Sequence, residues 1–400
     1  VEVEAKGQSA DGGKEAHVSL QPGSISSMHS HHSHSGEFCK HASSTLDEVL
    51  ARAHELGFTH FHLSEHVPRM RDAHLYPEEC EAGMTPASLT TQFLAYLSKA
   101  RELQSKYATM PHGMTVLVGC ETENIESPHS IDALTAMLHG DAVQDTPVPP
   151  PFVGRGTVDY IVGSVHHVHG IPIDFDEPTF QKALQVHGTK DGYTSLLHAY
   201  LDAQYEMLER LRPEVIGHFD LYRLFDPSAP WYPERTTPHG REVLSKLKRN
   251  IHFASSYGAL FETNSSAFRK GWKEETYPGR VILQLILRAH GRLALSDDSH
   301  GVHQVGLNYT RVRDYLLREG VNELWYLVPG GTLPSADKGG NLSEVHAASE
   351  EARQARELSD TPGRDAPTVF PRGTKALCLS DWHTHPFWDR LSSALPVPLP

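Results

Sequence analysis

Short runs of apolar residues alternate with longer amphipathic stretches along most of the chain. In the first such unit, apolar residues recur at helical spacing over 46–56, directly after Thr45-Leu-Asp-Glu48, which has the pattern of a capping box. Gly57 follows and predicts the end of that helix. The next run, Phe58-Thr-His-Phe-His-Leu-Ser64, predicts a strand. The first unit is therefore a helix followed by a strand.

The same alternation continues to residue 328. Further strands are predicted at 115–119, 158–165, 214–217, 259–261, 292–295 and 324–328. Amphipathic helices are predicted between them at 88–107, 190–212, 238–250, 279–290 and 310–319. This regular alternation predicts an α/β fold with parallel strands, and polar residues at the strand ends favour a barrel.

The alternating pattern occupies 28–328, which we expect to form a single domain. Residues 1–27 have no initiator Met and are rich in Gly, Ser, Glu and Lys, which predicts a disordered or non-native leader. Within the domain, 127–156 contains the Pro-rich run 146–151 and predicts an insertion loop over one face.

The chain after residue 328 is expected to lie outside the alternating core. Residues 329–373 are rich in Gly, Ser, Pro and charge, and they predict a mostly disordered linker with room for a short amphipathic helix near 343–358. Residues 374–400 predict a tail packed on the barrel as a strand or cap. This tail contains Asp381-Trp-His-Thr-His385, but too few residues follow it to complete a helix-and-strand unit.

Composition narrows the classes of function. The formal net charge of −14 argues against nucleic-acid binding, because phosphate contacts require a basic surface. The four cysteines are scattered without a C-x-x-C pair, so we expect a reducing compartment and no disulfide framework. No apolar run is long enough to span a membrane. A cytoplasmic protein without nucleic-acid or membrane partners is therefore predicted, and its oligomeric state is left open.

Ionisable residues collect at the ends of the predicted strands. Successive strands end in Glu65-His66, Cys120-Glu121, His166-His167, His218-Phe-Asp220, Glu262-Thr-Asn264 and Asp297-Asp-Ser-His300. The carboxyl ends of barrel strands meet on one face, where barrel enzymes place their active sites. Buried ionisable groups are costly unless they are paired or bind metal. The set therefore predicts a metal-binding catalytic face.

The densest group of histidines lies in Met28-His-Ser-His-His-Ser-His-Ser35, and His41 follows shortly after it. A His-x-His pair in extended backbone points both imidazoles to one side, because strand side chains alternate. Two imidazoles on one face can bind a divalent metal, and His41 offers a third. A flexible metal-scavenging tract is the alternative, but the polar strand ends downstream favour the folded site.

These segments resemble the successive motifs of the polymerase-and-histidinol-phosphatase (PHP) superfamily. The similar segments are 28–36, Leu63-Ser-Glu-His-Val-Pro-Arg69, Gly119-Cys-Glu121, Gly163-Ser-Val-His-His167, Gly217-His-Phe-Asp-Leu221, Glu262-Thr-Asn264 and Ser296-Asp-Asp-Ser-His300. Within the superfamily, the chain is most similar to the histidinol-phosphatase branch in its fungal form, over 28–328. The resemblance implies a distorted (β/α)7, TIM-like barrel that holds three divalent metal ions.

The resemblance also implies ligands for each ion. One ion would take His32, His34, Glu121 and Asp298, a second would share Glu121 and take His166 and His218, and a third would take His41, His66 and His300. The chain departs from its relatives at Glu65, where Asp is frequent, and by one extra residue between His34 and His41. The neighbouring histidines leave the register open by one or two positions, at His29/His31 beside His32/His34 and at His166/His167.

The implied ligands are imidazoles and carboxylates without a thiolate, which suits Zn²⁺, Mn²⁺ or Fe²⁺ in an open catalytic site. Glu121 and Asp298 are the predicted catalytic carboxylates, and Asp220 is a candidate proton donor for the leaving group. A hydroxide bridging two metals would attack a phosphate monoester directly. Glu65 is expected to orient a ligand rather than bind metal itself.

Cationic side chains just after the strand ends are expected to bind the phosphoryl group. The candidates are Arg269, then Arg223, with Lys270 and Arg69 after them. The branch resemblance implies L-histidinol phosphate as substrate, hydrolysed to L-histidinol and phosphate in histidine biosynthesis. Its imidazole and ammonium would require an aromatic wall and a carboxylate, and Phe219 and Tyr222 are candidates for the wall.

Two other functions are compatible with the sequence. One is a different PHP phosphoesterase or an amidohydrolase-type hydrolase, although amidohydrolases tend to use a carbamylated Lys and no predicted strand here ends in Lys. The other is a non-catalytic metal-binding module built on 29–41. Such a module would bind metal without Asp298, whereas the enzyme requires both Asp298 and His300.

Overall fold

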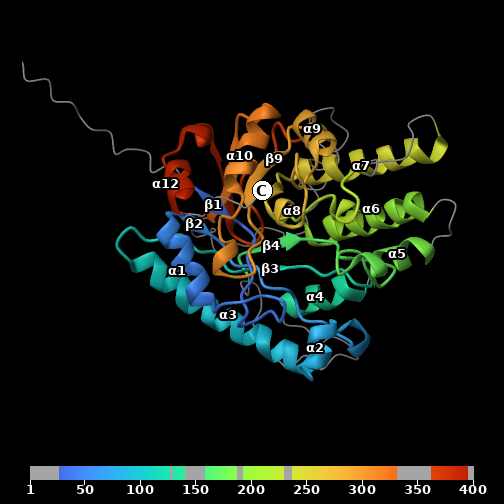
Figure 1. Ribbon diagram of the computed structural model, residues 1–400, viewed down its shortest axis with the longest axis horizontal. Coiled ribbons are helices and arrows are strands. Elements are labelled where there is room, and N and C mark those ends of the chain that lie inside the picture. The colour runs from blue at the N-terminus through green and yellow to red at the C-terminus, as the bar shows by residue number, and fades with distance from the viewer. Residues whose placement is uncertain are drawn as a thin grey trace, which may run out of the picture.

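Short parallel strands form a ring at the centre of the molecule, and helices surround this ring (Figure 1). The structure is a computed structural model that describes residues 27–126, 129–139, 158–186, 192–228, 237–330 and 362–394. Nearly all of the expected leader, most of the insertion loop, and most of the linker with its short helix lie outside the described residues. Within the described ranges, no helix combines the length and the apolar character needed to cross a lipid bilayer.

The predicted strands and helices occur in the predicted order, and further short elements lie between them. The strands are β1 (His29–Ser30), β2 (His60–Phe61), β3 (Gly119–Glu121), β4 (Tyr160–Gly163), β5 (His167–Val168), β6 (Ile171–Pro172), β7 (Val215–Ile216), β8 (Leu260–Asn264), β9 (Arg292–Ser296), β10 (Leu324–Pro329) and β11 (Thr374–Leu379). The α-helices are α1 (Leu46–Leu56), α2 (Pro77–Glu81), α3 (Pro86–Thr109), α4 (His129–His139), α5 (Glu177–Val186), α6 (Gly192–Leu211), α7 (Pro238–Ser256), α8 (Ser266–Arg269), α9 (Arg280–Arg288), α10 (Tyr309–Arg318) and α12 (Phe387–Ala394).

The ring is assembled from a five-stranded parallel sheet and a parallel pair. The sheet has the order β3-β4-β7-β8-β9, and β1 pairs with β2. Isolated parallel bridges join β2 and the residues after it to the segment that contains β3, among them His66–Glu121. A Ser33–Ser299 bridge and a hydrogen bond from His34 N to Ser299 O (2.7 Å) join the residues after β1 to those after β9. The predicted α/β fold with parallel strands is therefore confirmed, and seven of the described strands trace a ring.

Helix α1 shows how local sequence sets the boundaries of an element. Thr45 Oγ1 accepts a hydrogen bond from Glu48 N (3.3 Å), and Glu48 Oε2 accepts one from Thr45 N (2.7 Å). Gly57 ends the helix with a φ of 87°, a left-handed conformation that favours glycine. An added Cβ there would lie 2.9 Å from the Arg390 guanidinium. The predicted capping box and the predicted helix end are both confirmed.

Helix α4 differs from the insertion loop that the sequence predicted over 127–156. Its residues Ile131, Leu134 and Met137 recur at helical spacing and are buried. The loop was predicted from the Pro-rich run at 146–151. Residues 129–139 have enough apolar surface to form a helix that packs against α6.

The segment after residue 361 packs on the side of the ring. Strand β11 pairs antiparallel with β10, and Phe387 of α12 lies edge-on to Phe58 with ring centroids 4.8 Å apart. Trp382 and Trp388 are fully buried in this contact region. The second His-x-His sequence, which ends at His385, lies in the turn before α12. Among the described residues, it takes no part in a group of metal-type ligands.

Histidines on one side of the N-terminal tract have a structural role. His29 and His31 are fully buried, and their Nε2 atoms accept hydrogen bonds from Leu295 N (2.9 Å) and Leu327 N (3.0 Å). His62 Nδ1 likewise accepts a hydrogen bond from a backbone N–H, that of Leu117 (3.2 Å). These bonds require neutral rings, and burial holds the pKa of each of the three imidazoles well below its usual range. The rings thus supply hydrogen bonds where the short strands do not pair.

We expect His60→Phe to reduce the loss of stability in acid. Burial lowers the pKa of His60 to about 4, so between pH 6.5 and 4 the unfolded chain binds a proton that the folded protein does not. The stabilising effect is therefore complete above pH 6.5 and is lost as the pH falls toward 4. Phe would keep the packing on Tyr326, whose ring centroid lies 4.7 Å away, without titrating.

The measurement is the free energy of unfolding in urea at neutral pH and near pH 5, with equal metal loading of both proteins. Wild type should lose about 1–2 kcal/mol more than the variant on acidification. Equal losses would show that His60 titrates normally in the folded protein.

Candidate metal centre

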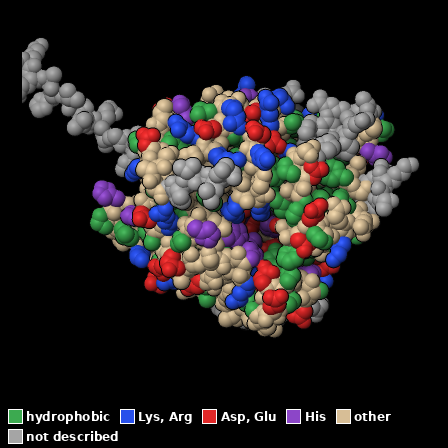
Figure 2. All heavy atoms as spheres, in the orientation of Figure 1, with side chains coloured by type: hydrophobic (Ala, Val, Ile, Leu, Met, Phe, Trp, Pro, Cys, Tyr) green, Lys and Arg blue, Asp and Glu red, His purple; other side chains and the backbone are tan. Residues whose placement is uncertain are grey.

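The carboxyl ends of the ring strands open onto a hollow in the surface. Figure 2 shows histidine side chains gathered around this hollow, with acidic side chains inside it. The cavity has a volume of about 540 Å³. The predicted site residues that line it are His41, His66, Glu121, His166, His218, Arg269, Lys270, Asp298 and His300. The structure therefore brings predicted metal ligands and predicted phosphate-binding cations to the same cavity.

The N-terminal tract delivers two buried histidines beneath this cavity. His32 and His34 follow β1 and, two residues apart, point to the same side. Their Nε2 atoms lie 3.1 and 3.3 Å from Glu121 Oε2, and 3.6 and 3.7 Å from Asp298 Oδ1. His31 instead accepts its hydrogen bond from the β10 backbone. The register that the sequence left open is thus one in which His32, not His31, faces the carboxylates.

Glu121 lies at the centre of five imidazoles, those of His32, His34, His66, His166 and His218. The first three face Oε2 at 3.1–3.3 Å, and the last two face Oε1 at 3.1–3.2 Å. Burial alone would raise the pKa of this carboxyl, but the surrounding histidines hold it well below its usual range. Each oxygen thus faces a different set of imidazoles, as expected of a carboxylate that bridges two metal ions.

The ligand-type atoms form overlapping groups in which all atoms lie within 4.8 Å of one another. The groups are His32, His34 and Asp298; His34, His66 and Glu121; Glu121, His166 and His218; and Cys39, His41, His66 and His300. We refer to the last of these as the Cys39 group. Every residue predicted as a metal ligand belongs to at least one of these groups.

The chemistry of the cluster fits divalent cations. The Nε2 atoms of His32, His34 and His66 are buried and form no hydrogen bond. An unpaired buried polar atom costs about 1–3 kcal/mol, and a bound cation would remove that cost. Imidazole and carboxylate donors suit Zn²⁺, Mn²⁺ and Fe²⁺.

Two carboxylates lie on the Nδ1 side of the N-terminal histidines. Glu262 of β8 lies 3.0 Å from His32 Nδ1, and Glu65 lies 3.6 Å from His34 Nδ1. Glu65 is itself fixed by hydrogen bonds from the Ser35 N–H (2.8 Å) and hydroxyl (2.7 Å). The contact with Glu262 orients the His32 ring and leaves its Nε2 for a metal, whereas the Glu65 carboxylate lies beside His34 at a distance too long for a hydrogen bond. Glu262 was not among the predicted site residues, whereas Glu65 lies beside His34, a predicted ligand.

Glu123 is a further carboxylate that the sequence analysis missed. It lies 2.8 Å from His66 Nδ1 and 3.4 Å from His166 Nδ1. Burial would raise the pKa of its carboxyl, but these histidines hold it well below its usual range. Glu123 follows Glu121 by two residues, so the alternation of extended backbone places both on one side and could have identified it.

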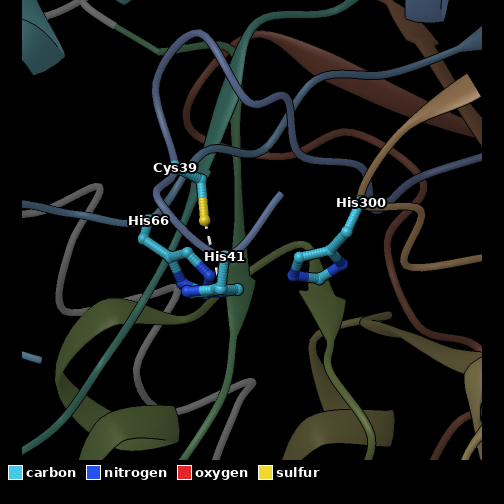
Figure 3. Close-up of side chains that lie close together, drawn as sticks. All are labelled: Cys39, His41, His66 and His300. Carbon is cyan, nitrogen blue, oxygen red and sulfur yellow. Dashed lines mark hydrogen bonds between the residues drawn. The ribbon is translucent and has the colours of Figure 1, made fainter. Parts of the chain in front are cut away.

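Cys39 contributes a thiol to the cluster, whereas the sequence analysis expected none. Figure 3 shows the thiol pointing toward the imidazoles, with Sγ 3.2 Å from His41 Nε2. Burial would raise the pKa of this thiol, but the neighbouring imidazoles of His41 and His66 lower it to about 6. No second cysteine lies near Cys39 in the sequence, so no spacing marks it as a ligand.

Arg269 and Lys270 are the predicted cations that reach the cavity. They lie at the end of α8, a short helix that directly follows β8. The Arg269 guanidinium donates to Asp298 O (3.0 Å) and Asp297 O (3.4 Å). These bonds hold its charge beside the metal-ligand groups.

Asp220 and Arg223 do not line the cavity. Arg223 donates to Asp220 Oδ2 (3.0 Å) and to Glu275 Oε1 (2.5 Å). Asp220 also accepts a hydrogen bond from Gly279 N (2.9 Å), and burial raises the pKa of its carboxyl. Their charges are therefore engaged with each other and with the loop before α9.

Arg69 also lies outside this cavity. It pairs with Glu79 and, at 3.3 Å, with Glu123. Its position suits support of Glu123, which in turn contacts His66 and His166.

Comparison with known proteins identifies the family to which the chain is similar. Residues 30–266 match the family model described as PHP domain. A Schizosaccharomyces pombe protein named "Probable histidinol-phosphatase" is 42% identical over 301 residues, which cover 75% of this chain and 90% of that protein. A Saccharomyces cerevisiae protein named "Histidinol-phosphatase" is 36% identical over 312 residues, which cover 72% of this chain and 88% of that protein.

A solved structure shows the same fold. The histidinol phosphate phosphatase of Lactococcus lactis subsp. lactis, complexed with zinc, L-histidinol and phosphate, matches with a TM-score of 0.51. The match covers 74% of this chain and 95% of that chain at 17% identity. At this identity the likeness establishes the fold alone.

We expect Glu262→Gln to weaken metal binding without removing a ligand. The amide would support the His32 ring less well than the carboxylate, so the ion beside His32 should bind about 10–100-fold more weakly. Titration against a competing chelator measures this affinity. Glu275→Gln, at a carboxylate paired with Arg223 outside the cavity, is the matched control. The same affinity in both variants would contradict a supporting role for Glu262.

Proposed function

The chain belongs to the PHP domain family, and we propose that it is a metal-dependent phosphatase that hydrolyses L-histidinol phosphate to L-histidinol and phosphate. The observation that carries the proposal is the meeting of metal-ligand groups and two cations in one cavity. The names of the relatives that it resembles over most of its length support the substrate. The reaction belongs to histidine biosynthesis, which would place the protein in the cytoplasm.

We assign three divalent ions, Zn²⁺, Mn²⁺ or Fe²⁺, to the ligand groups. One would take His32, His34, Glu121 and Asp298, a second Glu121, His166 and His218, and a third His41, His66 and His300. When bound, such ions would polarise the phosphoryl oxygens and make water nucleophilic near neutral pH. The composition of the observed groups supports this assignment.

Arg269 and Lys270 are the residues that we assign to the phosphate. A phosphate monoester carries negative charge that grows on the leaving oxygen during hydrolysis, and cationic donors stabilise it. A guanidinium can donate two parallel hydrogen bonds to phosphate oxygens. The bond from Arg269 to Asp298 O (3.0 Å) holds this group at the cavity before substrate binds. Lys270 adds a second positive charge.

Tyr76, Asp174 and Phe175 are the residues that we assign to the organic part of the substrate. All three line the cavity and together offer two aromatic rings and a carboxylate, which suits an imidazole and an ammonium group. Phe219 and Tyr222, which the sequence suggested for the aromatic wall, are each 1% exposed and do not line the cavity.

Asp220 is better assigned to holding the loop after β7 than to donating a proton. Its carboxylate is fully buried and accepts hydrogen bonds from Arg223 and Gly279. Those bonds fix the turn that presents His218 to Glu121.

Phosphate release from L-histidinol phosphate, measured beside a panel of other phosphomonoesters with metal-loaded protein, tests the proposal. We expect a strong preference for L-histidinol phosphate. Asp298→Asn should lower kcat/KM by about 10²-fold or more, because it removes a charged ligand beside His32 and His34. Metal content and circular dichroism of the variant separate loss of the site from loss of the fold.

The outcomes distinguish the alternatives. Equal activity on many esters would retain the phosphatase and remove the proposed substrate. A folded, metal-loaded wild type that hydrolyses no ester would overturn the enzyme assignment. Metal binding confined to 29–41 and unaffected by Asp298→Asn would favour the non-catalytic module.

Arg269→Ala should lower kcat/KM by about 10²–10³-fold through lost stabilisation of the phosphoryl group. The control is Arg311→Ala, because the Arg311 guanidinium packs over Phe268 of the same helix, 3.9 Å from its ring centroid, but does not line the cavity. Steady-state kinetics should separate the two variants. Similar losses in both would indicate that Arg269 acts only by packing α8.

A further inference from the structure

We propose that Cys39 binds, as a thiolate, the metal ion assigned to His41, His66 and His300, so that the Cys39 group is a four-ligand position selective for zinc. The inference rests on the metal occupancy in the proposed function and is independent of the substrate. It also predicts that this ion has no open coordination position, unlike the ions around Glu121.

The three imidazoles of the Cys39 group are oriented for binding through Nε2. His41 Nδ1 lies 2.9 Å from a carboxylate oxygen of Glu78, His66 Nδ1 lies 2.8 Å from a carboxylate oxygen, and His300 Nδ1 lies 3.0 Å from a backbone oxygen. An oxygen partner at Nδ1 fixes the tautomer and leaves the Nε2 lone pair free for a metal. The partner that Nε2 of His41 faces is the Cys39 sulfur, at 3.2 Å.

Two of the four side chains, those of Cys39 and His66, are shielded from solvent, whereas the His41 side chain is 36% exposed and lines the cavity. Cys39 is 6% exposed, and the His66 side chain is 9% exposed, with an Nε2 atom that forms no hydrogen bond. Figure 3 shows the four side chains converging from three separate segments of the chain. A buried nitrogen without a partner, beside a thiol and two further imidazoles within 4.8 Å, is the arrangement that a soft cation would complete.

The turn before α1 holds Cys39 in place through backbone bonds. Cys39 N donates to Ser35 O (2.9 Å), and Gly36 N donates to Ser44 O (2.8 Å). The two backbone segments of this turn approach each other so closely that a Cβ on Gly36 would lie 2.8 Å from Ser43 Cα. These backbone bonds place the thiol beside the three imidazoles.

The donor atoms divide the metal centre into two chemical classes. Thiolate with imidazole is a preferred set for zinc, and four protein ligands complete a tetrahedral site that leaves no position for water. The groups around Glu121 contain only imidazoles and carboxylates, which also suit Mn²⁺ and Fe²⁺ and keep positions open. Water and phosphate would accordingly bind at the Glu121 groups. The ion of the Cys39 group would instead hold together the turn before α1, the segment after β2 and the loop after β9.

Zinc K-edge X-ray absorption of the zinc-loaded full chain tests the inference directly. Zinc bound by sulfur shows a shell at about 2.3 Å, distinct from nitrogen ligands at about 2.0–2.1 Å. We expect this sulfur shell in wild type. Cys39→Ser should lose the shell and should bind about one zinc ion per chain fewer than wild type. Cys80→Ser, which changes an exposed cysteine, should retain the shell. A wild type without the shell, or a shell that persists in Cys39→Ser, overturns the inference.

A second variant covers the case in which Cys39→Ser does not fold. The combined replacement of Cys80, Cys120 and Cys378 leaves Cys39 as the single cysteine, so a retained sulfur shell supports the inference and a lost shell overturns it. Failure of the proposed function has a different signature, since the sulfur shell would be present while L-histidinol phosphate is not hydrolysed.

Discussion

The structure depends on keeping the Glu121 carboxylate charged although it is 1% exposed. Burial of an isolated carboxylate costs several kcal/mol, and here five imidazoles within 3.1–3.3 Å offset that cost. So many imidazoles cannot all carry protons side by side, which favours metal cations between them and the carboxylate. The ring strands are only two to five residues long where they deliver these ligands.

The two sides of the N-terminal tract have different roles around Glu121. Because extended backbone alternates, His32 and His34 face Glu121 while His29 and His31 face the strands behind. The metal-facing rings lie among carboxylates, whereas the structural rings must stay neutral to accept backbone hydrogen bonds. A shift of one residue would exchange the two sets and leave both without partners, so the register of this tract is strongly determined.

Local sequence predicted most of the strands and helices, and the polar strand ends predicted the face on which the ligand-type residues gather. The capping box at Thr45 and the end of α1 at Gly57 are set by neighbouring residues, so sequence was sufficient there. Cys39 and Phe175 were missed because their roles depend on segments brought together only by the closed ring. Glu123 was missed although its spacing of two residues from Glu121 places it on the same side of extended backbone. Strand-end position indicated which residues approach the site, but it could not distinguish a cation that reaches the cavity from one already paired with a buried carboxylate.

The arrangement of charge in the cavity explains how one substrate orientation could be selected. The cations of Arg269 and Lys270 come from the end of α8, whereas the carboxylates of Glu78 and Asp174 come from α2 and from the loop after β6. A molecule with a phosphate at one end and an ammonium at the other would meet favourable charge in one direction and repulsion in the reverse. Metal ions beside Asp298 would strengthen the preference at the phosphate end. A net negative protein surface is therefore compatible with an anionic substrate, because local charge at the cavity rather than net charge decides its binding.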